Sequence, residues 1–319
     1  MPRWSHSSGR WRRCQVAVTT AAAACVLAAC GTGHPGPGPT ASDTKTAVAD
    51  ITAAPTEVAD TALGAVGYRE VGHGPALVMI IGYSASMDLW APYFVNALAA
   101  HFRVVVFDNA GIGQTAALTA PLSVPEMAAQ TSALISTLRL GRCDILGWSM
   151  GGLIAQSLAV THPGQVRSLV LAATQAGTGK AAPVPSAAQA ALDSGDGVSV
   201  LFPADQIAAT VRYAAGIHSY PGYYTASATV RAEQQTAVGQ WIAGDDAPGR
   251  HPGEIQAATL VADGTEDALD PVSNDHMLAR LIHGARLVLY PDAGHAFLFQ
   301  DAGNFVSELR SFLDQQKGH

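Results

Sequence analysis

The chain has 319 residues, of which 48% are hydrophobic and 13% charged, with a formal net charge of −7. This balance excludes a disordered chain, which would be poor in apolar residues and rich in charge, and the acidic net charge argues against nucleic acid as a partner. No apolar run in the sequence reaches the roughly 18 residues that a bilayer-spanning helix needs.

The N-terminus carries four arginines and then the apolar run Val16–Ala29, which is typical of an export signal. The run ends in Leu27-Ala28-Ala29-Cys30, which resembles the lipobox of bacterial lipoproteins, where a peptidase cuts before a cysteine that carries diacylglycerol. We therefore predict a lipoprotein signal peptide over residues 1–29 and lipidation of Cys30. The alternative is an ordinary signal peptide in which Cys30 is incidental. Arg12-Arg13 leave twin-arginine and general export both open.

Residues 30–60 are rich in Gly, Pro, Thr, Ala and Asp, so we predict a flexible tether. Removal of residues 1–29 takes away four arginines and no acid, which changes the net charge from −7 to −11. Because a polybasic patch cannot then hold the chain on anionic lipid, the two acyl chains of the modified cysteine would be the membrane contact. The expected location is the outer face of the bacterial cell membrane.

Beyond the tether, short apolar runs alternate with helical patterns. The expected strands are Ala65–Val71 at a sheet edge, Ala76–Gly82, Arg103–Asp108, Cys143–Gly147, Val166–Ala173, Ala258–Ala262 and Ala285–Tyr290. The expected helices are Asp88–Ala100, Pro125–Leu140, Met150–His162, Ser273–Ile282 and Phe305–Gln315. This alternation predicts an α/β fold, a mostly parallel sheet with helices on both faces. Ligands of such sheets bind at the carboxyl ends of the strands, so the loops there are the candidates for chemistry.

One such loop reads Gly147-Trp148-Ser149-Met150-Gly151, a G-x-S-x-G pattern between an expected strand and an expected helix. In that context the pattern is typical of a nucleophile elbow, a turn so sharp that glycine is needed two positions before and after the serine. The hydroxyl of Ser149 would project above a helix N-terminus, where the dipole favours negative charge. A glycine-rich turn with a solvated serine is the alternative.

A serine nucleophile needs a base, and the base needs an acid that orients it. In elbow folds the acid and the histidine follow the serine in the chain. Loops after two later strands offer carboxylates and His295, and at this point the sequence resembles the α/β-hydrolase family over roughly residues 65–316. The resemblance implies Asp267, at the end of a G-x-x-D pattern, as the acid and His295 as the base, with Asp263 and Asp270 as rival acids.

The resemblance also implies an oxyanion hole made of the backbone N–H groups of Met150 and Tyr83. The family commonly has His-Gly-x in the loop after the first parallel strand, whereas this chain has Ile81-Gly82-Tyr83. A backbone donor does not require that histidine, but the hydrogen bonds that support the loop must come from elsewhere.

The resemblance divides the chain into a hydrolase core, residues 61–174 and 256–319, and a cap (lid) insertion, residues 175–255. Helical patterns in the insertion lie around Ala187–Leu192, Ala204–Ala214 and Ala226–Ile242. Its aromatic residues are Phe202, Tyr213, Tyr220, Tyr223, Tyr224 and Trp241. An apolar, aromatic roof suits an acyl or alkyl group better than an anionic substrate; the alternative is that these side chains only pack the cap on the core.

The function implied is a serine hydrolase, most simply an esterase- or lipase-like carboxylic ester hydrolase that forms an acyl-enzyme with an apolar small-molecule substrate. The alternatives are a cofactor-free haloperoxidase or perhydrolase, a C–C hydrolase, an aminopeptidase, or a surface lipoprotein that binds a ligand without catalysis. No cofactor or metal is expected. Gly111-Ile112-Gly113 resembles the start of a dinucleotide motif, but Pro121 and Pro125 interrupt the stretch where its helix would follow.

Overall fold

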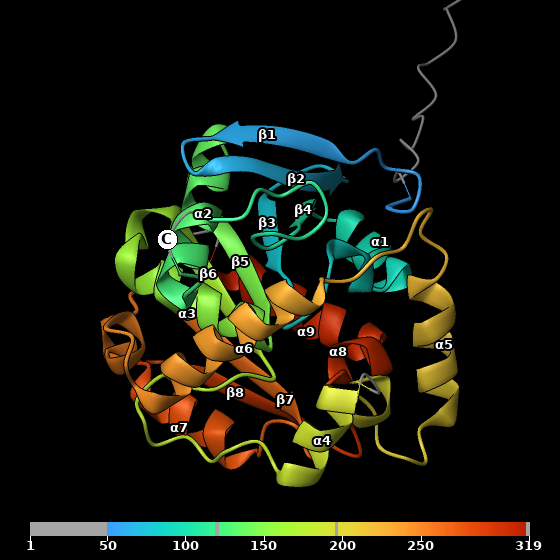
Figure 1. Ribbon diagram of the computed structural model, residues 1–319, viewed down its shortest axis with the longest axis vertical. Coiled ribbons are helices and arrows are strands. Elements are labelled where there is room, and N and C mark those ends of the chain that lie inside the picture. Colours follow the sequence, from blue (N-terminus) through green and yellow to red (C-terminus); the bar gives the residue numbers. More distant parts are fainter. Residues whose placement is uncertain (1–49, 119–120, 195–196, 317–319) are drawn as a thin grey trace, which may run out of the picture. The chain divides into compact units, whose positions relative to one another are not determined.

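The computed structural model describes residues 50–118, 121–194 and 197–316 (Figure 1). The predicted signal peptide, the predicted lipidation site Cys30 and most of the predicted tether lie outside the described residues. A search of the described helices for one long and apolar enough to cross a bilayer finds none.

A single eight-stranded sheet runs through the described part of the chain, in the order β1-β2-β4-β3-β5-β6-β7-β8. The strands are β1 (Glu57–Thr61), β2 (Gly64–Val71), β3 (Ala76–Ile80), β4 (Arg103–Phe107), β5 (Cys143–Trp148), β6 (Val166–Ala172), β7 (Ala258–Gly264) and β8 (Arg286–Tyr290). β1 and β2 are antiparallel to their neighbours, whereas all pairs from β4 to β8 are parallel. The predicted α/β fold with a mostly parallel sheet is confirmed.

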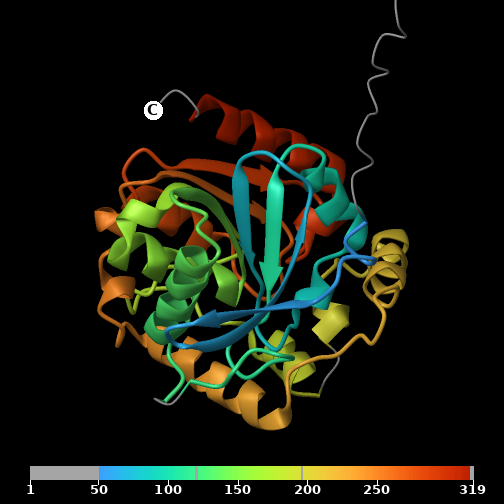
Figure 2. The same ribbon diagram turned by 90° about the horizontal axis from the view of Figure 1, so that it is seen from above.

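The sheet separates two apolar cores because side chains alternate between its faces along each strand. On β3, Leu77 and Met79 belong to one core, and Val78 and Ile80 to the other. The first core is closed by α1 (Pro92–Ala99), α8 (Phe297–Gln300) and α9 (Ala302–Gln315), and the second by α2 (Val124–Thr137), α3 (Met150–Thr161) and α7 (Ser273–Leu281). Figure 2 shows the two groups of helices on opposite sides of the sheet.

The prediction that the tether extends to residue 60 is wrong. Residues 57–61 form strand β1, which pairs with β2, so β2 is not the edge strand that the sequence suggested. Ile51 is fully buried, and its N–H donates to Asn96 Oδ1 at 2.9 Å. Only Ala59 of β1 is buried, so the strand carries no apolar alternation that could reveal it in the sequence.

The helix predicted from Asp88 begins later, at Pro92. A short 3₁₀ turn, η1 (Met87–Leu89), precedes it, and the chain is extended at Ala91 with φ −53° and ψ 126°. Proline disfavours helical backbone at the preceding residue, which explains the break. Asp88 is therefore not part of α1 but is buried in the 3₁₀ turn before it, paired with Arg69.

Three α-helices lie between β6 and β7 in the residues that the structure describes, near the patterns predicted for the insertion. They are α4 (Ser186–Ser194), α5 (Ile207–Ile217) and α6 (Ala228–Ala243). Figure 1 shows them as the yellow-green to orange helices. We refer to this helical insertion below as the cap; its predicted boundaries at residues 175 and 255 stay predictions.

Candidate active site

Ser149 occupies the sharp turn between β5 and α3, with φ 56° and ψ −124°, a conformation that is strained for a residue with a side chain. Its N–H donates to Ala172 O at 2.9 Å, which ties the turn to β6. A Cβ at Gly147 would collide with the backbone of Gly151, and a Cβ at Gly151 would collide with Ile80 O. The two glycines are thus required by contact with neighbouring backbone.

Asp267 and His295 form a buried pair, in which the Asp267 Oδ2 atom lies 2.6 Å from His295 Nδ1. Their side chains are 0% and 4% exposed. The other oxygen of Asp267 accepts the N–H groups of Leu269 (2.6 Å) and Asp270 (2.9 Å), which fixes the carboxylate plane. The rivals make other bonds: Asp263 Oδ1 accepts the N–H of its neighbour Gly264.

Electrostatics keep His295 basic in spite of its burial. Burial lowers the pKa of the imidazole, but the charge of Asp267 and the hydrogen bond to it outweigh this effect, so the pKa is raised above its usual 6.5. The Trp148 indole packs against the His295 imidazole, with ring centroids 5.7 Å apart, and Trp148 Nε1 donates a hydrogen bond to His295 O at 3.0 Å. The Asp267 contact assigns the proton of the neutral ring to Nδ1 and leaves Nε2 as an acceptor.

The two backbone N–H groups expected in an oxyanion hole flank Ser149. Met150 is the first residue of α3, where an N–H has no partner within the helix. On the other side, a Cβ at Gly82 would lie 3.1 Å from the Ser149 Cβ and 3.7 Å from its Oγ, so the loop that carries Tyr83 is in contact with the serine. In place of the family's histidine, Asn109 Nδ2 supports this loop by donating to Ile81 O at 3.1 Å.

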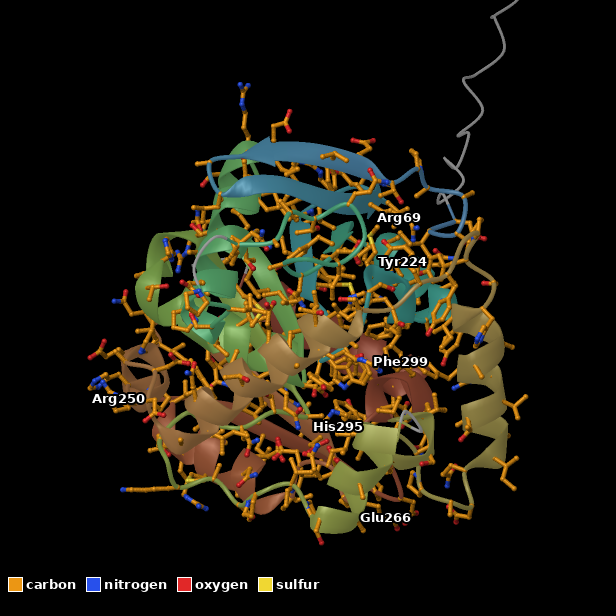
Figure 3. All side chains as sticks on the ribbon, viewed as in Figure 1. Arg69, Tyr224, Arg250, Glu266, His295 and Phe299 are labelled. Atoms are coloured by element: carbon orange, nitrogen blue, oxygen red, sulfur yellow. The ribbon has the colours of Figure 1, made fainter. Side chains whose placement is uncertain are left out.

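Ser149, His295 and Tyr83 all line a cavity of about 260 Å³ beneath the cap. Most of the other lining residues are apolar, among them Leu89, Trp148, Leu192, Val198, Leu201, Tyr213, Ile217, Tyr223 and Leu269. A second cavity of about 110 Å³ shares Ser149, His295 and Tyr83 and is also lined by Thr174, Gln175 and Asp270. The serine therefore stands where two cavities meet; Figure 3 labels His295 at this position.

The model of the alpha/beta hydrolase fold family matches residues 75–302 of the chain. The chain belongs to the α/β-hydrolase family. It is 30% identical over 250 residues to a poly(3-hydroxyalkanoate) depolymerase of Ectopseudomonas oleovorans, a match that covers 77% of this chain and 86% of that one.

Solved structures agree with this assignment. An alpha/beta hydrolase fold protein from Chitinophaga pinensis superposes with a TM-score of 0.72 at 25% identity, over 83% of this chain and 99% of that one. The N-acyl homoserine lactone degrading enzyme Est816 superposes with a TM-score of 0.63 at 26% identity, over 77% and 97%. The family match shows that this chain is an α/β-hydrolase, and the relatives show that hydrolases are among the proteins it resembles.

The aromatic residues of the α/β-hydrolase's cap serve both of the roles considered from the sequence. Tyr213 and Tyr223 line the larger cavity. Tyr213 also donates a hydrogen bond to the core, to Leu89 O at 3.1 Å, as do Tyr220 and Tyr224, which line neither cavity. The fully buried Trp241 belongs to the second core cluster. The cap is both a roof over the cavity and a packed part of the fold.

A cluster of three buried carboxyl groups lies beside the Asp267 loop, and sequence reasoning missed one of them. Asp263, Asp270 and Asp275 place one oxygen each within 4.8 Å of one another, and no other such group of metal-ligating side chains occurs among the described residues. Burial first, and then the charge of Asp267, raise the pKa of Asp270 to about 7; burial and the charges of neighbouring carboxylates raise that of Asp275 to about 8 and hold that of Asp263 well above its usual range. The cluster therefore retains protons near neutral pH, and those protons compete with a cation.

Proposed function

We propose that this α/β-hydrolase is a serine hydrolase of carboxylic esters that acts through an acyl-enzyme on an apolar substrate. The observation that carries the proposal is the convergence of Ser149 with the Asp267–His295 pair at one apolar cavity. A nucleophile on a strained elbow, a base with a raised pKa and a buried acid that orients the base are the parts that acyl transfer needs.

In the proposed reaction, Ser149 Oγ attacks the ester carbonyl while His295 Nε2 takes the hydroxyl proton. Asp267 stabilises the imidazolium, and the N–H groups of Tyr83 and Met150 bind the oxyanion of the tetrahedral intermediate. The intermediate expels the alcohol, which receives the proton from His295. Water then attacks the acyl-enzyme by the same steps, which releases the carboxylic acid and restores the serine.

The mostly apolar lining of the larger cavity supports the proposal that it holds the acyl group of the substrate. Its volume of about 260 Å³ is near the lower end for ligand pockets, so it favours short and medium chains over long ones. No carboxylate lines it among the described residues, and Arg231 is the cation on its wall. The smaller cavity, which shares Ser149 and His295 with the larger one, would take the alcohol.

A fluorophosphonate probe, which reacts with an activated serine, tests the proposal together with p-nitrophenyl esters of two to twelve carbons. We expect labelling of the wild type, none of a Ser149→Ala variant, and a maximum rate at short or medium chains. A ligand-binding lipoprotein without catalysis would neither label nor turn over esters. Oxidation of bromide with acetate and peroxide in place of ester cleavage would favour the perhydrolase alternative.

We further propose that the enzyme is anchored by lipid on Cys30 to the outer face of the bacterial membrane. The support is the sequence alone: the basic start, the apolar run and the Leu27-Ala28-Ala29-Cys30 motif. An apolar ester substrate is consistent with a place at a lipid surface.

A further inference from the structure

The loop that carries Tyr83 contains a strained residue next to the proposed oxyanion donor. Ser84 has φ 62°, in the left-handed region that residues with a side chain avoid. Such a conformation persists only where surrounding contacts hold it. Because Ser84 directly follows Tyr83, a change of its backbone would rotate the peptides on which the N–H of Tyr83 depends.

Both backbone groups of Ser84 are bound by the cap. Its N–H donates to Gln234 Oε1 at 2.8 Å, and its carbonyl oxygen accepts the N–H of Ala226 at 3.2 Å. Gln234 lies on α6 and is fully buried. The strained residue belongs to the core, and both of these hydrogen bonds come from the cap. Ser84 and Gln234 are separated by 150 positions in the sequence.

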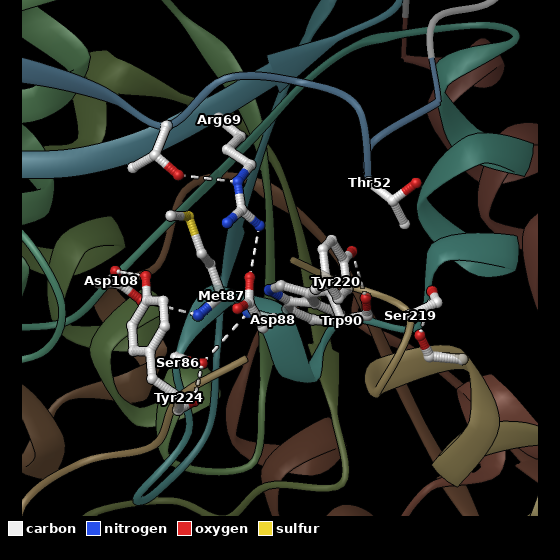
Figure 4. Close-up of polar contacts among 12 residues, drawn as sticks. Thr52, Arg69, Ser86, Met87, Asp88, Trp90, Asp108, Ser219, Tyr220 and Tyr224 are labelled. Carbon is white, nitrogen blue, oxygen red and sulfur yellow. Dashed lines mark hydrogen bonds and ion pairs between the residues drawn. The ribbon is translucent and has the colours of Figure 1, made fainter. Parts of the chain in front are cut away.

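The segment that leads into α6, residues 220–226, is itself fastened to the core on the same side; we call it the strap. Tyr220 donates to Trp90 O at 2.8 Å, and its ring lies 5.2 Å from the guanidinium of Arg69. Tyr224 O accepts the hydroxyl of Ser86 at 2.6 Å (Figure 4). The strap therefore has little freedom to shift with respect to the loop.

Asp108 links the strap and the loop through its two oxygens. Oδ2 accepts the hydroxyl of Tyr224 at 2.5 Å, and Oδ1 accepts the N–H of Met87 at 2.8 Å (Figure 4). The carboxyl group is fully buried, so each lost bond would leave an unpaired polar atom. The loop from Gly82 to Met87 is thus held by cap contacts at Ser84 and Ser86 and by Asp108 at its end.

We propose that Gln234 is a positioning residue, which holds the Tyr83 N–H in place through Ser84 and so makes the oxyanion hole depend on a seated cap. The inference rests on the proposed function. Together with the hydrogen bond from Asn109 to Ile81 O, it explains how the loop is held without the histidine that the family commonly has there. It also predicts that the cap contributes to the chemical step as well as to substrate binding.

The test compares Gln234→Met, which keeps the volume and removes the acceptor, with Gln234→Glu, which keeps an acceptor oxygen. Gln240→Met, on an exposed position of the same helix, is the matched control. With a p-nitrophenyl ester we expect kcat of Gln234→Met to fall about 10- to 100-fold, because a misplaced oxyanion donor acts on the transition state. KM should stay within about 3-fold, Gln234→Glu should recover most of kcat, and Gln240→Met should match the wild type.

A second readout separates positioning from a general loosening of the cap. An alkylboronic acid forms a tetrahedral adduct with the serine, so its inhibition constant should rise in proportion to the loss of kcat, whereas that of the matching carboxylic acid should not. If Gln234→Met folds poorly, Tyr224→Phe removes a contact at the strap and should lower kcat about 3- to 10-fold.

Several outcomes would overturn the inference: an unchanged kcat in Gln234→Met or, where that variant does not fold, in Tyr224→Phe; a loss that appears only in KM; or an equal loss in Gln240→Met. A wild type that neither labels nor cleaves esters is a different result. It removes the proposed function, and with it the reaction that Gln234 would serve.

Discussion

Replacement of Asp267 by Asn tests the proposed acid with a change of one atom. Asp267 uses both oxygens: Oδ2 faces His295 Nδ1, and Oδ1 accepts two backbone N–H groups, those of Leu269 and Asp270. An Asn side chain has one oxygen, and the two backbone N–H donors attract this oxygen more strongly than the single Nδ1–H of His295 does. Its NH₂ group would then face Nδ1 and force the proton of His295 onto Nε2, where it blocks acceptance of the Ser149 proton.

The expected loss of kcat is about four orders of magnitude, as for the wrong histidine tautomer in triads generally. This corresponds to about 5 kcal/mol of transition-state stabilisation at 1.36 kcal/mol per tenfold change. Steady-state hydrolysis of a p-nitrophenyl ester at pH 8, with active sites counted by fluorophosphonate labelling of the wild type, gives the ratio.

Asp263→Asn is the matched control for this change. The pKa of Asp263 is raised well above its usual range by burial, so the native group is protonated and an amide imitates it. We expect its kcat within about tenfold of the wild type. Equal losses in the two variants, or a loss below tenfold in Asp267→Asn, would refute the assignment of the acid.

The remaining predictions concern the nucleophile, the base, the elbow, the buried acids and the anchor. Ser149→Ala should lower ester turnover by about 10⁴ with an unchanged melting temperature; a tenth of the activity remaining would exclude Ser149 as nucleophile. Because His295 must be neutral to act as a base and its pKa is raised, kcat/KM should fall as pH decreases through a midpoint above 6.5; a midpoint below 6 would contradict this. Gly151→Ala should give poorly soluble protein with a lower melting temperature, since its Cβ meets the Ile80 carbonyl. Asp275 has a raised pKa of about 8, so its protonated form favours the fold, and stability should be lost as pH rises towards 8; thermal melts of Asp275→Asn should show a smaller loss. Cys30→Ala should abolish detergent partitioning and labelling by an alkynyl fatty acid without affecting catalysis, and a variant still found with membranes would refute the lipid anchor.

The sequence allowed prediction of features that depend on local pattern. The parallel strands are continuous apolar runs, and the elbow has two glycines at fixed distances from Ser149, so both could be located without a structure. The resemblance to the family implies Asp267 as the acid, and the structure places Asp267 against His295. The catalytic roles of the three residues remain predictions.

The features that sequence reasoning missed depend on contacts between distant segments. Strand β1 has a single buried residue, and it becomes a strand because β2 offers it a free edge. Gln234 is one of several polar residues on α6, and nothing in the local pattern shows that it is buried against Ser84. Asp275 likewise looks like an ordinary acid in the first turn of α7 until Asp263 is placed beside it. Such partners become visible only when the chain is folded.

The packing of Trp148 against His295 gives the protein an optical reporter of its own. An excited indole transfers an electron to a nearby imidazolium far more readily than to a neutral imidazole, so protonation of His295 should quench the emission of Trp148. Trp90 lies 6.0 Å from Trp148, ring centroid to ring centroid, so energy transfer between the two indoles lets its emission follow the same change, whereas the fully buried Trp241 supplies a background. A fluorescence titration would follow the charge of the base in the resting protein, without a substrate and in any variant that keeps the indole.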